Sequence, residues 1–345
     1  MDRVLHGGDV YRHKDVIDFS ANLNPLGMPP AARQALIEYV DEFSHYPDPD
    51  CVALTEAIAA FEGVDTDKVV VTAGATDAFE RIAQVLKPRR ALVVAPSYAG
   101  YEEALRHVGT HVVRHKLSSR EGFRLTDKIL AEMDGTDVVF IANPNNPTGL
   151  TVDRDLLEAI LGRAHLLGST VVLDECFIDL TDEPGSNDLL SSYPNLIIVK
   201  ALTKTYALAG LRLGYALTAD VRMTERLKDA GAIWAVSVPA EVAGIASLRD
   251  TVYLRESREL IRHNRDYLMG VLASEGLSFL PGQANFLLFE AKRGLFERML
   301  AHKILIRPCA NFAGLGPSHF RICVRTRPDC EAFADALSQS VEELA

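Results

Sequence analysis

The sequence has no apolar run that approaches the roughly 20 residues needed to cross a membrane. The segment Met1–Gly8 also lacks the apolar middle of a secretory signal. We therefore expect a cytoplasmic protein with no membrane partner. The sequence contains no internal repeat and no low-complexity tract.

Cysteine is also scarce. The chain has five cysteines, an odd number, and no C-x-x-C pair. This argues against a disulfide framework and a zinc ribbon, so we expect free, mostly buried thiols. His107, His111 and His115 are spaced by four residues, and alternation along a strand would place all three on one face. Because Gly109 and the valines after His111 indicate a turn entering a strand, we expect no metal site here.

Positive charge is in short supply, since 36 lysines and arginines face 47 aspartates and glutamates, for a formal net charge of −11. Nucleic acids bind basic surfaces, so no nucleic-acid partner is expected. A phosphorylated ligand would have to be attracted by particular arginines against the overall field. The remaining composition, with 48% hydrophobic and 24% charged residues, is typical of a soluble globular protein.

Short apolar runs alternate with amphipathic segments through the middle of the chain. Expected helices include Asp77–Leu86 and Asp153–Leu161, where apolar residues recur every three or four positions. The runs between the helices are rich in β-branched residues, which is typical of strands covered on both faces. This order predicts an α/β fold with a mostly parallel sheet and helices on both faces. The expected strands are Lys68–Thr72, Ala91–Ala95, Asp137–Ala142, Thr170–Leu173, Leu196–Val199 and Leu213–Leu217.

The length of 345 residues favours two domains, because a single core usually stops growing at roughly 250 to 300 residues. The strand–helix rhythm stops near Pro239. Beyond it we expect one long helical region over Ala240–Glu275, strands around 285–289 and 319–324, and a final helix from Asp329. We therefore divide the chain into an N-terminal arm (1–26), a large domain (27–238) and a smaller α+β domain (239–345).

Lys204 follows the expected strand Leu196–Val199 and precedes Arg212 by eight positions. A primary amine at the end of a buried strand can bind an aldehyde cofactor covalently. A guanidinium can hold the phosphate of that cofactor with two parallel N–H donors. The pair therefore indicates pyridoxal 5'-phosphate chemistry. Because most lysines are solvated surface charges, the interpretation depends on the neighbouring motifs.

A turn at Gly74, Ala75 and Thr76 joins an expected strand to a helix, so its backbone N–H groups can cradle a phosphate at the positive end of the helix dipole. A second motif, Asn143–Gly149, is a loop made rigid by two prolines. In that loop Asn146 is the expected donor to the ring oxygen of the cofactor and to the substrate carboxylate.

Asp174 ends the expected strand that begins at Thr170. A carboxylate there can pair with a protonated pyridine nitrogen and keep the ring able to accept electrons. A plain helix-start pair with Glu175 is the commoner use of such residues, but Lys204 one strand later favours the functional interpretation.

Taken together, Asn143–Gly149, Asp174-Glu175, Lys204 and Gly210–Gly214 resemble the fold-type I pyridoxal phosphate enzymes of the aspartate aminotransferase superfamily, in the branch near histidinol-phosphate aminotransferase. The resemblance spans nearly the whole chain. It implies that the large domain binds the cofactor and that the protein is a homodimer with active sites at the subunit interface.

The resemblance also implies roles for two tyrosines. Tyr98 would stack on the cofactor ring, and Tyr46 would reach the phosphate in the neighbouring subunit. Two positions depart from the pattern of the superfamily. Ala201 stands where Ser or Thr often binds the phosphate, which leaves more of that role to Thr203 and the turn at 74–76. Phe177 stands where a tyrosine usually bonds the ring oxygen.

The segments around His6-Gly-Gly, Asp18–Gly27 and Arg307–Leu315 resemble the L-threonine O-3-phosphate decarboxylase family of cobalamin biosynthesis, as does Phe177. Histidinol-phosphate aminotransferases do not typically carry the N-terminal His-Gly-Gly. Within these segments we count His6 and Asn24 among the substrate-binding residues.

A phosphorylated amino acid carries a carboxylate and a phosphate, so its site needs two anion-binding points. Arg307 and Arg321, assisted by His6, are the candidates, and each charged hydrogen bond contributes roughly 1.5 to 3 kcal/mol. The predicted reaction converts L-threonine O-3-phosphate to (R)-1-aminopropan-2-ol O-phosphate and CO₂.

Two alternatives remain. The same residues serve transamination, so an aminotransferase of the histidinol-phosphate type stays open. A non-catalytic pyridoxal phosphate protein, such as the effector-binding part of a regulator, is disfavoured because Lys204 and both arginines are present and no DNA-binding extension precedes His6.

Overall fold

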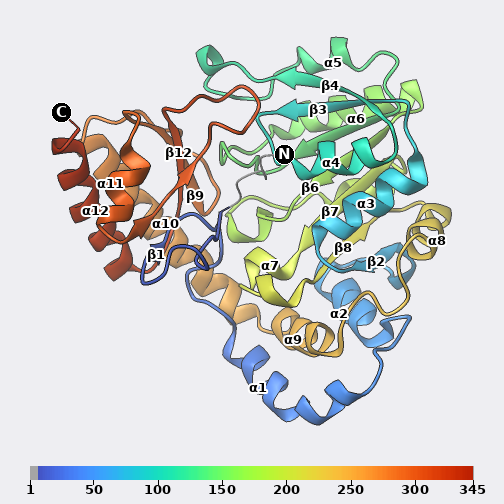
Figure 1. Cartoon of the computed structure of the whole chain (residues 1–345). Helices are drawn as coiled ribbons and strands as arrows, with labels where there is room; N and C mark the ends of the chain where they lie inside the picture. Colours follow the sequence, from blue (N-terminus) through green and yellow to red (C-terminus); the bar gives the residue numbers. More distant parts are fainter. Residues whose placement is uncertain (1–6, 345) are drawn as a thin grey trace.

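A seven-stranded sheet forms the centre of the computed structural model, which describes residues 7–344 (Figure 1). In spatial order the strands are β2 (Val69–Thr72), β8 (Gly214–Leu217), β7 (Leu196–Ala201), β6 (Thr170–Asp174), β5 (Val138–Ala142), β3 (Arg90–Ala95) and β4 (His111–Lys116). The strands from β7 to β4 pair in parallel, whereas β8 is antiparallel to both β2 and β7. The predicted α/β fold with a mostly parallel sheet is confirmed.

Alternate side chains of each strand enter two different apolar cores. In β5, Val139 and Ile141 join the core formed with α2, α6 and α9, whereas Val138 and Phe140 join the core formed with α3, α4 and α8. This division explains the continuously apolar strand sequences, because both faces of the sheet are covered. The α-helices up to residue 248 are α1 (Pro30–Glu38), α2 (Val52–Glu62), α3 (Ala75–Leu86), α4 (Gly100–His107), α5 (Ile129–Glu132), α6 (Arg154–Leu167), α7 (Leu202–Thr205), α8 (Val221–Asp229) and α9 (Val238–Leu248).

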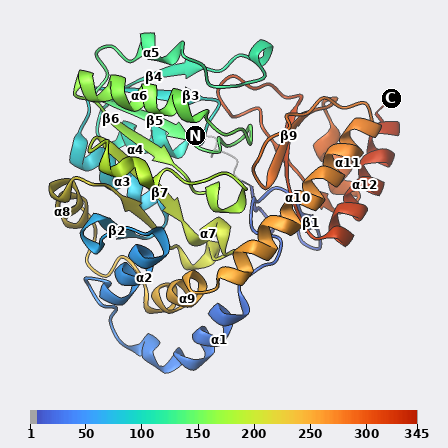
Figure 2. The same ribbon diagram turned by 180° about the vertical axis from the view of Figure 1, so that it is seen from behind.

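A third apolar core lies in the C-terminal part of the chain, where α11 and α12 pack beside a small antiparallel sheet of order β11-β12-β9 (Figures 1 and 2). Phe19 belongs to this core, and β1 (Ile17–Asp18) pairs in parallel with β10 (Ile304–Leu305). The N-terminal arm is therefore tied to the C-terminal part. The other elements here are α10 (Thr251–Ser274), β9 (Phe286–Glu290), α11 (Leu295–Ala301), β11 (Arg307–Pro308), β12 (His319–Cys323) and α12 (Arg327–Glu342).

The helical region expected over Ala240–Glu275 is confirmed, but it is divided into two helices, α9 and α10. The side chain of Asp250 accepts a hydrogen bond from the Tyr253 N–H at 3.0 Å and caps the start of α10. Figure 2 shows α10 running from the neighbourhood of α9 to the C-terminal part. Its first turn contributes Tyr253 to one core of the large sheet and its later turns contribute Leu268 to the third core. The domain boundaries at 26 and 238 stay a prediction.

The expectation that His107, His111 and His115 share one face of a strand is wrong. His107 ends α4 and contacts Glu80 at 3.0 Å, whereas His111 and His115 lie in β4. Between residues 7 and 344 no three His, Cys, Asp or Glu side chains are grouped in a way that could hold a metal ion. All five cysteines are buried and unbridged, as expected. Over the same range no helix combines the length and apolarity needed to cross a membrane.

Candidate active site

The fold brings the candidate cofactor residues to one edge of the large sheet. Parallel strands end at the same edge, and ligands of such sheets bind outside the carboxyl ends of the strands. Because β8 is antiparallel to β7, it begins where β7 ends, and the residue pair Ala201 and Gly214 lies in register there. The candidate residues at this edge end or follow β2, β3, β5, β6 and β7, or precede β8. They are Gly74, Ala75, Thr76, Tyr98, Asn146, Asp174, Thr203, Lys204 and Arg212.

Lys204 lies in the short helix α7, directly after β7. Its Nζ lies 3.5 Å from Oγ1 of the buried Thr203. Burial lowers the pKa of the Lys204 amine, and the guanidinium groups of Arg212 and Arg321 lower it further, against the opposing effect of Asp174. A lower pKa enlarges the fraction of neutral amine, the form that attacks an aldehyde. The position therefore fits a lysine that holds an aldehyde cofactor.

Asp174 ends β6 with both carboxylate oxygens engaged. One oxygen accepts a hydrogen bond from the Tyr101 hydroxyl and the other from the Cys176 N–H at 3.0 Å. Tyr101 is fully buried and stacks on Phe140, with ring centroids 5.5 Å apart. Burial and the nearby Asp174 carboxylate raise the pKa of Tyr101 well above its ordinary range, so the phenol stays a donor. This arrangement fixes the carboxylate expected to face a pyridine nitrogen.

Tyr101 is a residue that the sequence analysis missed. Its only sequence signal is its position three residues after Tyr98. The two rings pack edge to face with centroids 5.6 Å apart. The Tyr98 hydroxyl also lies 3.4 Å from Thr76 Oγ1. Tyr98 therefore lies between the turn at 74–76 and the partner of Asp174.

Gly74 and Arg212 lie next to each other, where the sequence predicts a phosphate cradle. Gly74 is the N-cap of α3 and has a φ of 86°. A methyl group on Gly74 would lie 3.0 Å from Arg212 Nη2, so the guanidinium lies close over a turn that has no side chain at this point. The first N–H groups of a helix lack intrahelical partners and carry the positive end of its dipole. A guanidinium beside them makes a site for a dianion.

Arg321 and Arg307 lie directly opposite each other in the antiparallel pair β11–β12, so their side chains share one face. Both are buried, and burial lowers the pKa of Arg321 to about 10, which leaves it charged at neutral pH. Arg321 donates to Asn146 Oδ1 through Nη1 and to the Ser20 carbonyl at 2.8 Å through Nη2. Arg307 donates to Asn311 Oδ1 at 3.0 Å. Two buried guanidinium groups on one face concentrate positive charge, so this face is suited to an anionic ligand.

Asn24 lies next to Lys204, but its side-chain amide is directed into the protein. Its Nδ2 donates to the Thr205 carbonyl at 2.8 Å and to Ser257 Oγ at 2.7 Å, and its backbone N–H donates to the Lys204 carbonyl at 3.1 Å. These bonds hold the Lys204 segment in place. The other N-terminal candidate, His6, lies outside the described residues.

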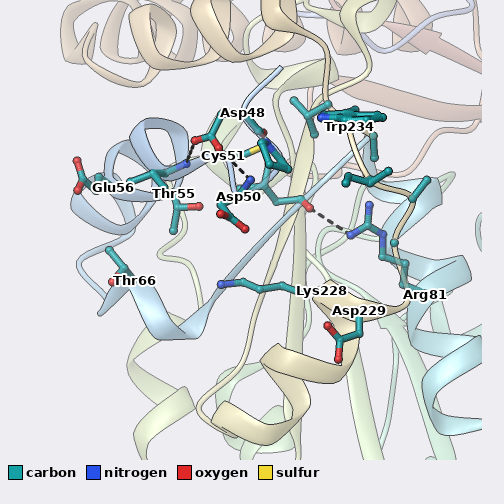
Figure 3. Close-up of a pocket in the computed structure, with 18 of the residues that line it drawn as sticks. Asp48, Asp50, Cys51, Thr55, Glu56, Thr66, Arg81, Lys228, Asp229 and Trp234 are labelled. Atoms are coloured by element: carbon teal, nitrogen blue, oxygen red, sulfur yellow. Dashed lines mark hydrogen bonds between the residues drawn. The ribbon is translucent and has the colours of Figure 1, made fainter. Parts of the chain in front are cut away.

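Tyr46 is not brought to the Lys204 site within one chain. It is 79% exposed and stacks on Trp234, with ring centroids 4.5 Å apart. Beside it lies a cavity of about 700 Å³, between the segment after Asp48, Arg81 and the segment that carries Trp234 (Figure 3). None of the candidate cofactor residues lines this cavity.

Glu175 is a second residue whose role the sequence did not reveal. Its fully buried carboxylate accepts hydrogen bonds from Asn143 Nδ2 at 3.3 Å, from Ser186 Oγ at 2.7 Å and from the Ser186 N–H at 3.2 Å. Burial raises its pKa to about 7, against the opposing effect of Lys200. Glu175 thus ties the start of the loop that carries Asn146 to the end of β6.

Comparison with known proteins shows what this chain resembles. The pattern of the family described as aminotransferase class I and II matches residues 14–337. A threonine-phosphate decarboxylase from Salmonella typhimurium is 35% identical over 354 residues, which cover 99% of this chain and 97% of the relative. A histidinol-phosphate aminotransferase from Moorella thermoacetica is 34% identical over 339 residues, which cover 94% and 86%. The crystal structure of a histidinol-phosphate aminotransferase from Clostridium acetobutylicum matches with a TM-score of 0.89 at 29% identity, covering 94% of this chain and 99% of that chain.

Proposed function

This chain belongs to the class I and II aminotransferase family, and we propose that it decarboxylates L-threonine O-3-phosphate to (R)-1-aminopropan-2-ol O-phosphate and CO₂ in cobalamin biosynthesis. Its cofactor is pyridoxal 5'-phosphate. The observation that carries the proposal is the pair of buried arginines, Arg307 and Arg321, on one face of β11–β12.

The described residues fit this cofactor. The amine of Lys204 has a lowered pKa, and the guanidinium of Arg212 lies over the side-chain-free turn at Gly74. We assign covalent attachment to Lys204, the phosphate to Arg212 and the 74–76 turn, and the pyridine nitrogen to Asp174. When bound, the cofactor accepts the electron pair of whichever bond at the substrate α-carbon stands perpendicular to its ring. Residues that orient the substrate therefore decide which bond breaks.

The choice between decarboxylation and transamination rests on the substrate anions, because overall identity to the two kinds of relative is nearly equal at 35% and 34%. Threonine phosphate carries two anionic groups, whereas histidinol phosphate carries only a phosphate. Two adjacent buried guanidinium groups suit the first substrate better. The His-Gly-Gly segment at the N-terminus supports the same choice. The similarity to the aminotransferase from Clostridium acetobutylicum, at a TM-score of 0.89, keeps transamination as the second candidate.

The test is to incubate the purified holoenzyme with L-threonine O-3-phosphate and measure CO₂ release, against amination of a 2-oxo acid. We expect stoichiometric CO₂ and the phosphorylated amino alcohol. L-Serine O-phosphate should be compared, since one methyl group changes the preference by only about 1 to 3 kcal/mol. Amination without CO₂ would instead identify an aminotransferase.

The variant Arg307→Ala should weaken the binding of threonine phosphate far more than the binding of threonine. Loss of one charge-assisted hydrogen bond, roughly 1.5 to 3 kcal/mol, corresponds to a rise in KM of about ten- to a hundredfold for the phosphorylated substrate. Steady-state kinetics with both substrates measure the difference, with Arg222→Ala on the surface helix α8 as the control. If KM rises equally for both substrates, Arg307 does not bind the phosphate.

We also propose a homodimer in which Tyr46 reaches the site of the second copy. Tyr46 is exposed beside the cavity of Figure 3, and other exposed apolar side chains lie nearby in sequence or along the cavity rim, among them Ile37, Val40 and Ile233. A soluble monomer rarely leaves such a group uncovered. Light scattering of the purified holoenzyme decides the point, and a monomeric mass would contradict it.

A further inference from the structure

Gly7 and Gly8 lie directly against Ser20, although the proposed chemistry uses neither glycine. A methyl group on Gly7 would lie 2.1 Å from the Ser20 carbonyl oxygen, far inside the closest approach of such atoms. The Gly8 N–H donates to Ser20 Oγ at 2.7 Å, and Gly8 has a φ of 86°, which favours glycine. The contact therefore requires that position 7 carry no side chain.

Ser20 connects this contact to the substrate-binding arginine. Its carbonyl oxygen accepts the 2.8 Å hydrogen bond from Arg321 Nη2. Its hydroxyl donates to Asp18 Oδ1 at 2.6 Å, and its backbone N–H donates to the same oxygen at 2.7 Å. With its hydrogen directed at Asp18, the hydroxyl is left as an acceptor for the Gly8 N–H. Ser20 is thus held from two sides, and the oxygen that Gly7 covers is the one that Arg321 uses.

The orientation of the Arg321 guanidinium depends on this oxygen. Its Nη1 bonds Asn146, its Nη2 bonds Ser20, and the Phe286 ring lies beside it with the centroid 5.5 Å from Cζ. A planar guanidinium receives an anion with two parallel N–H donors, so a rotation about the Cδ–Nε bond misaligns both. If the Ser20 carbonyl oxygen is removed or displaced, Nη2 loses its acceptor. The guanidinium plane is then held only through Nη1.

We propose that the Gly7-Gly8 segment is a positioning element for Arg321, which fixes the Ser20 carbonyl and so the plane of the guanidinium that receives the substrate anion. The inference rests on the anion-binding role given to Arg321 above. It supplies a physical reason for a glycine pair in the N-terminal segment. It also links that segment to substrate binding through backbone contacts rather than through a side chain of its own.

The experiment compares Gly7→Ala and Ser20→Ala with wild type, all as holoenzymes. Ser20→Ala removes the acceptor for Gly8 without adding bulk, so it tests the same contact if Gly7→Ala folds poorly. We expect KM for threonine phosphate to rise roughly tenfold or more in each, with a smaller change in kcat. The affinity for acetate, a simple carboxylate, measured by calorimetry, should fall in parallel, while the visible absorbance of the cofactor stays unchanged. Gly162→Ala is the matched control, because a methyl group there meets open space.

Wild-type KM and acetate affinity in both variants would overturn the inference. Loss of the visible cofactor band in step with activity would also overturn it, because general damage to the cofactor site predicts that result. The proposed function fails separately, if wild type releases no CO₂ from threonine phosphate. In that case the acetate titrations still test the positioning of Arg321, since they need no reaction.

Discussion

Replacing Lys204 by alanine is expected to abolish turnover, with kcat lowered by at least about a thousandfold, while the protein stays folded. The amine is the one covalent attachment point assigned to the cofactor, and it is also the expected proton carrier at the substrate α-carbon. Loss of a positioned acid–base group alone lowers rates by about 10² to 10⁴. Pre-steady-state and steady-state assays of CO₂ release measure the loss of turnover, and the visible absorbance spectrum measures the loss of covalent attachment.

The matched control is Lys116→Ala, which removes an exposed lysine at the end of β4. It should keep both the spectrum and the activity of wild type. Dialysis should remove the cofactor from the Lys204 variant more readily, because Arg212, the 74–76 turn and Asp174 would then hold it without a covalent bond. A Lys204→Ala variant that keeps wild-type turnover would remove the basis for the whole site assignment.

The sheet could be predicted because its information is local. Six of the seven strands are apolar runs, such as 170–173, where the structure has β6 at Thr170–Asp174, whereas the edge strand β4 is mostly polar. Once a parallel sheet is expected, the residues after each strand must meet at one edge, which is why Lys204 and Asp174 could be related from sequence. The turn at 74–76 follows from the same argument, whereas the short helix α7 is not predicted.

The remaining features depend on contacts between segments that lie far apart in the sequence. The bond between Tyr101 and Asp174 joins α4 to β6, and the pairing of Arg307 with Arg321 follows from the register of two short strands. The contact of Gly7 with Ser20 is a steric relation between backbones, which no residue pattern encodes. The break between α9 and α10 depends on an Asp250 cap that the apolar periodicity does not reveal.

Lys200 belongs to another such group, a buried cluster of charges near the end of β7. Its Nζ donates to Glu62 Oε1 at 2.7 Å and to Asp179 Oδ1 at 2.9 Å, and the side chains of Lys200 and Glu62 are each only 3% exposed. The hydroxyl of Tyr215 also donates to Glu62. Burial alone would lower the pKa of Lys200, but Asp179 and Glu62 outweigh it and raise the pKa above its ordinary value. The ammonium group is therefore charged and compensates two buried carboxylates.

The variant Lys200→Met is expected to lower the free energy of unfolding by roughly 3 to 5 kcal/mol, because it keeps the volume of the side chain and leaves buried carboxylates without their cation. Proteins of ordinary stability have only about 5 to 15 kcal/mol in total, so this single change removes a large part. Urea unfolding of the holoenzyme measures it. The cofactor concentration must be equal for all variants, since a ligand of the native state shifts the apparent stability.

Lys68→Met is the control, because Lys68 pairs with Asp65 at 2.8 Å but Asp65 is 77% exposed. Solvent screens such a pair, so its loss should shift the urea midpoint far less. A double variant, Lys200→Met with Glu62→Gln, should recover part of the stability, since it removes one of the two stranded charges. Equal midpoint shifts for Lys200→Met and Lys68→Met would mean that Lys200 does not compensate the buried carboxylates. The two lysines then separate two requirements, because Lys204, just after β7, is expected to be needed for turnover, and Lys200, within β7, for the stability of the strand end.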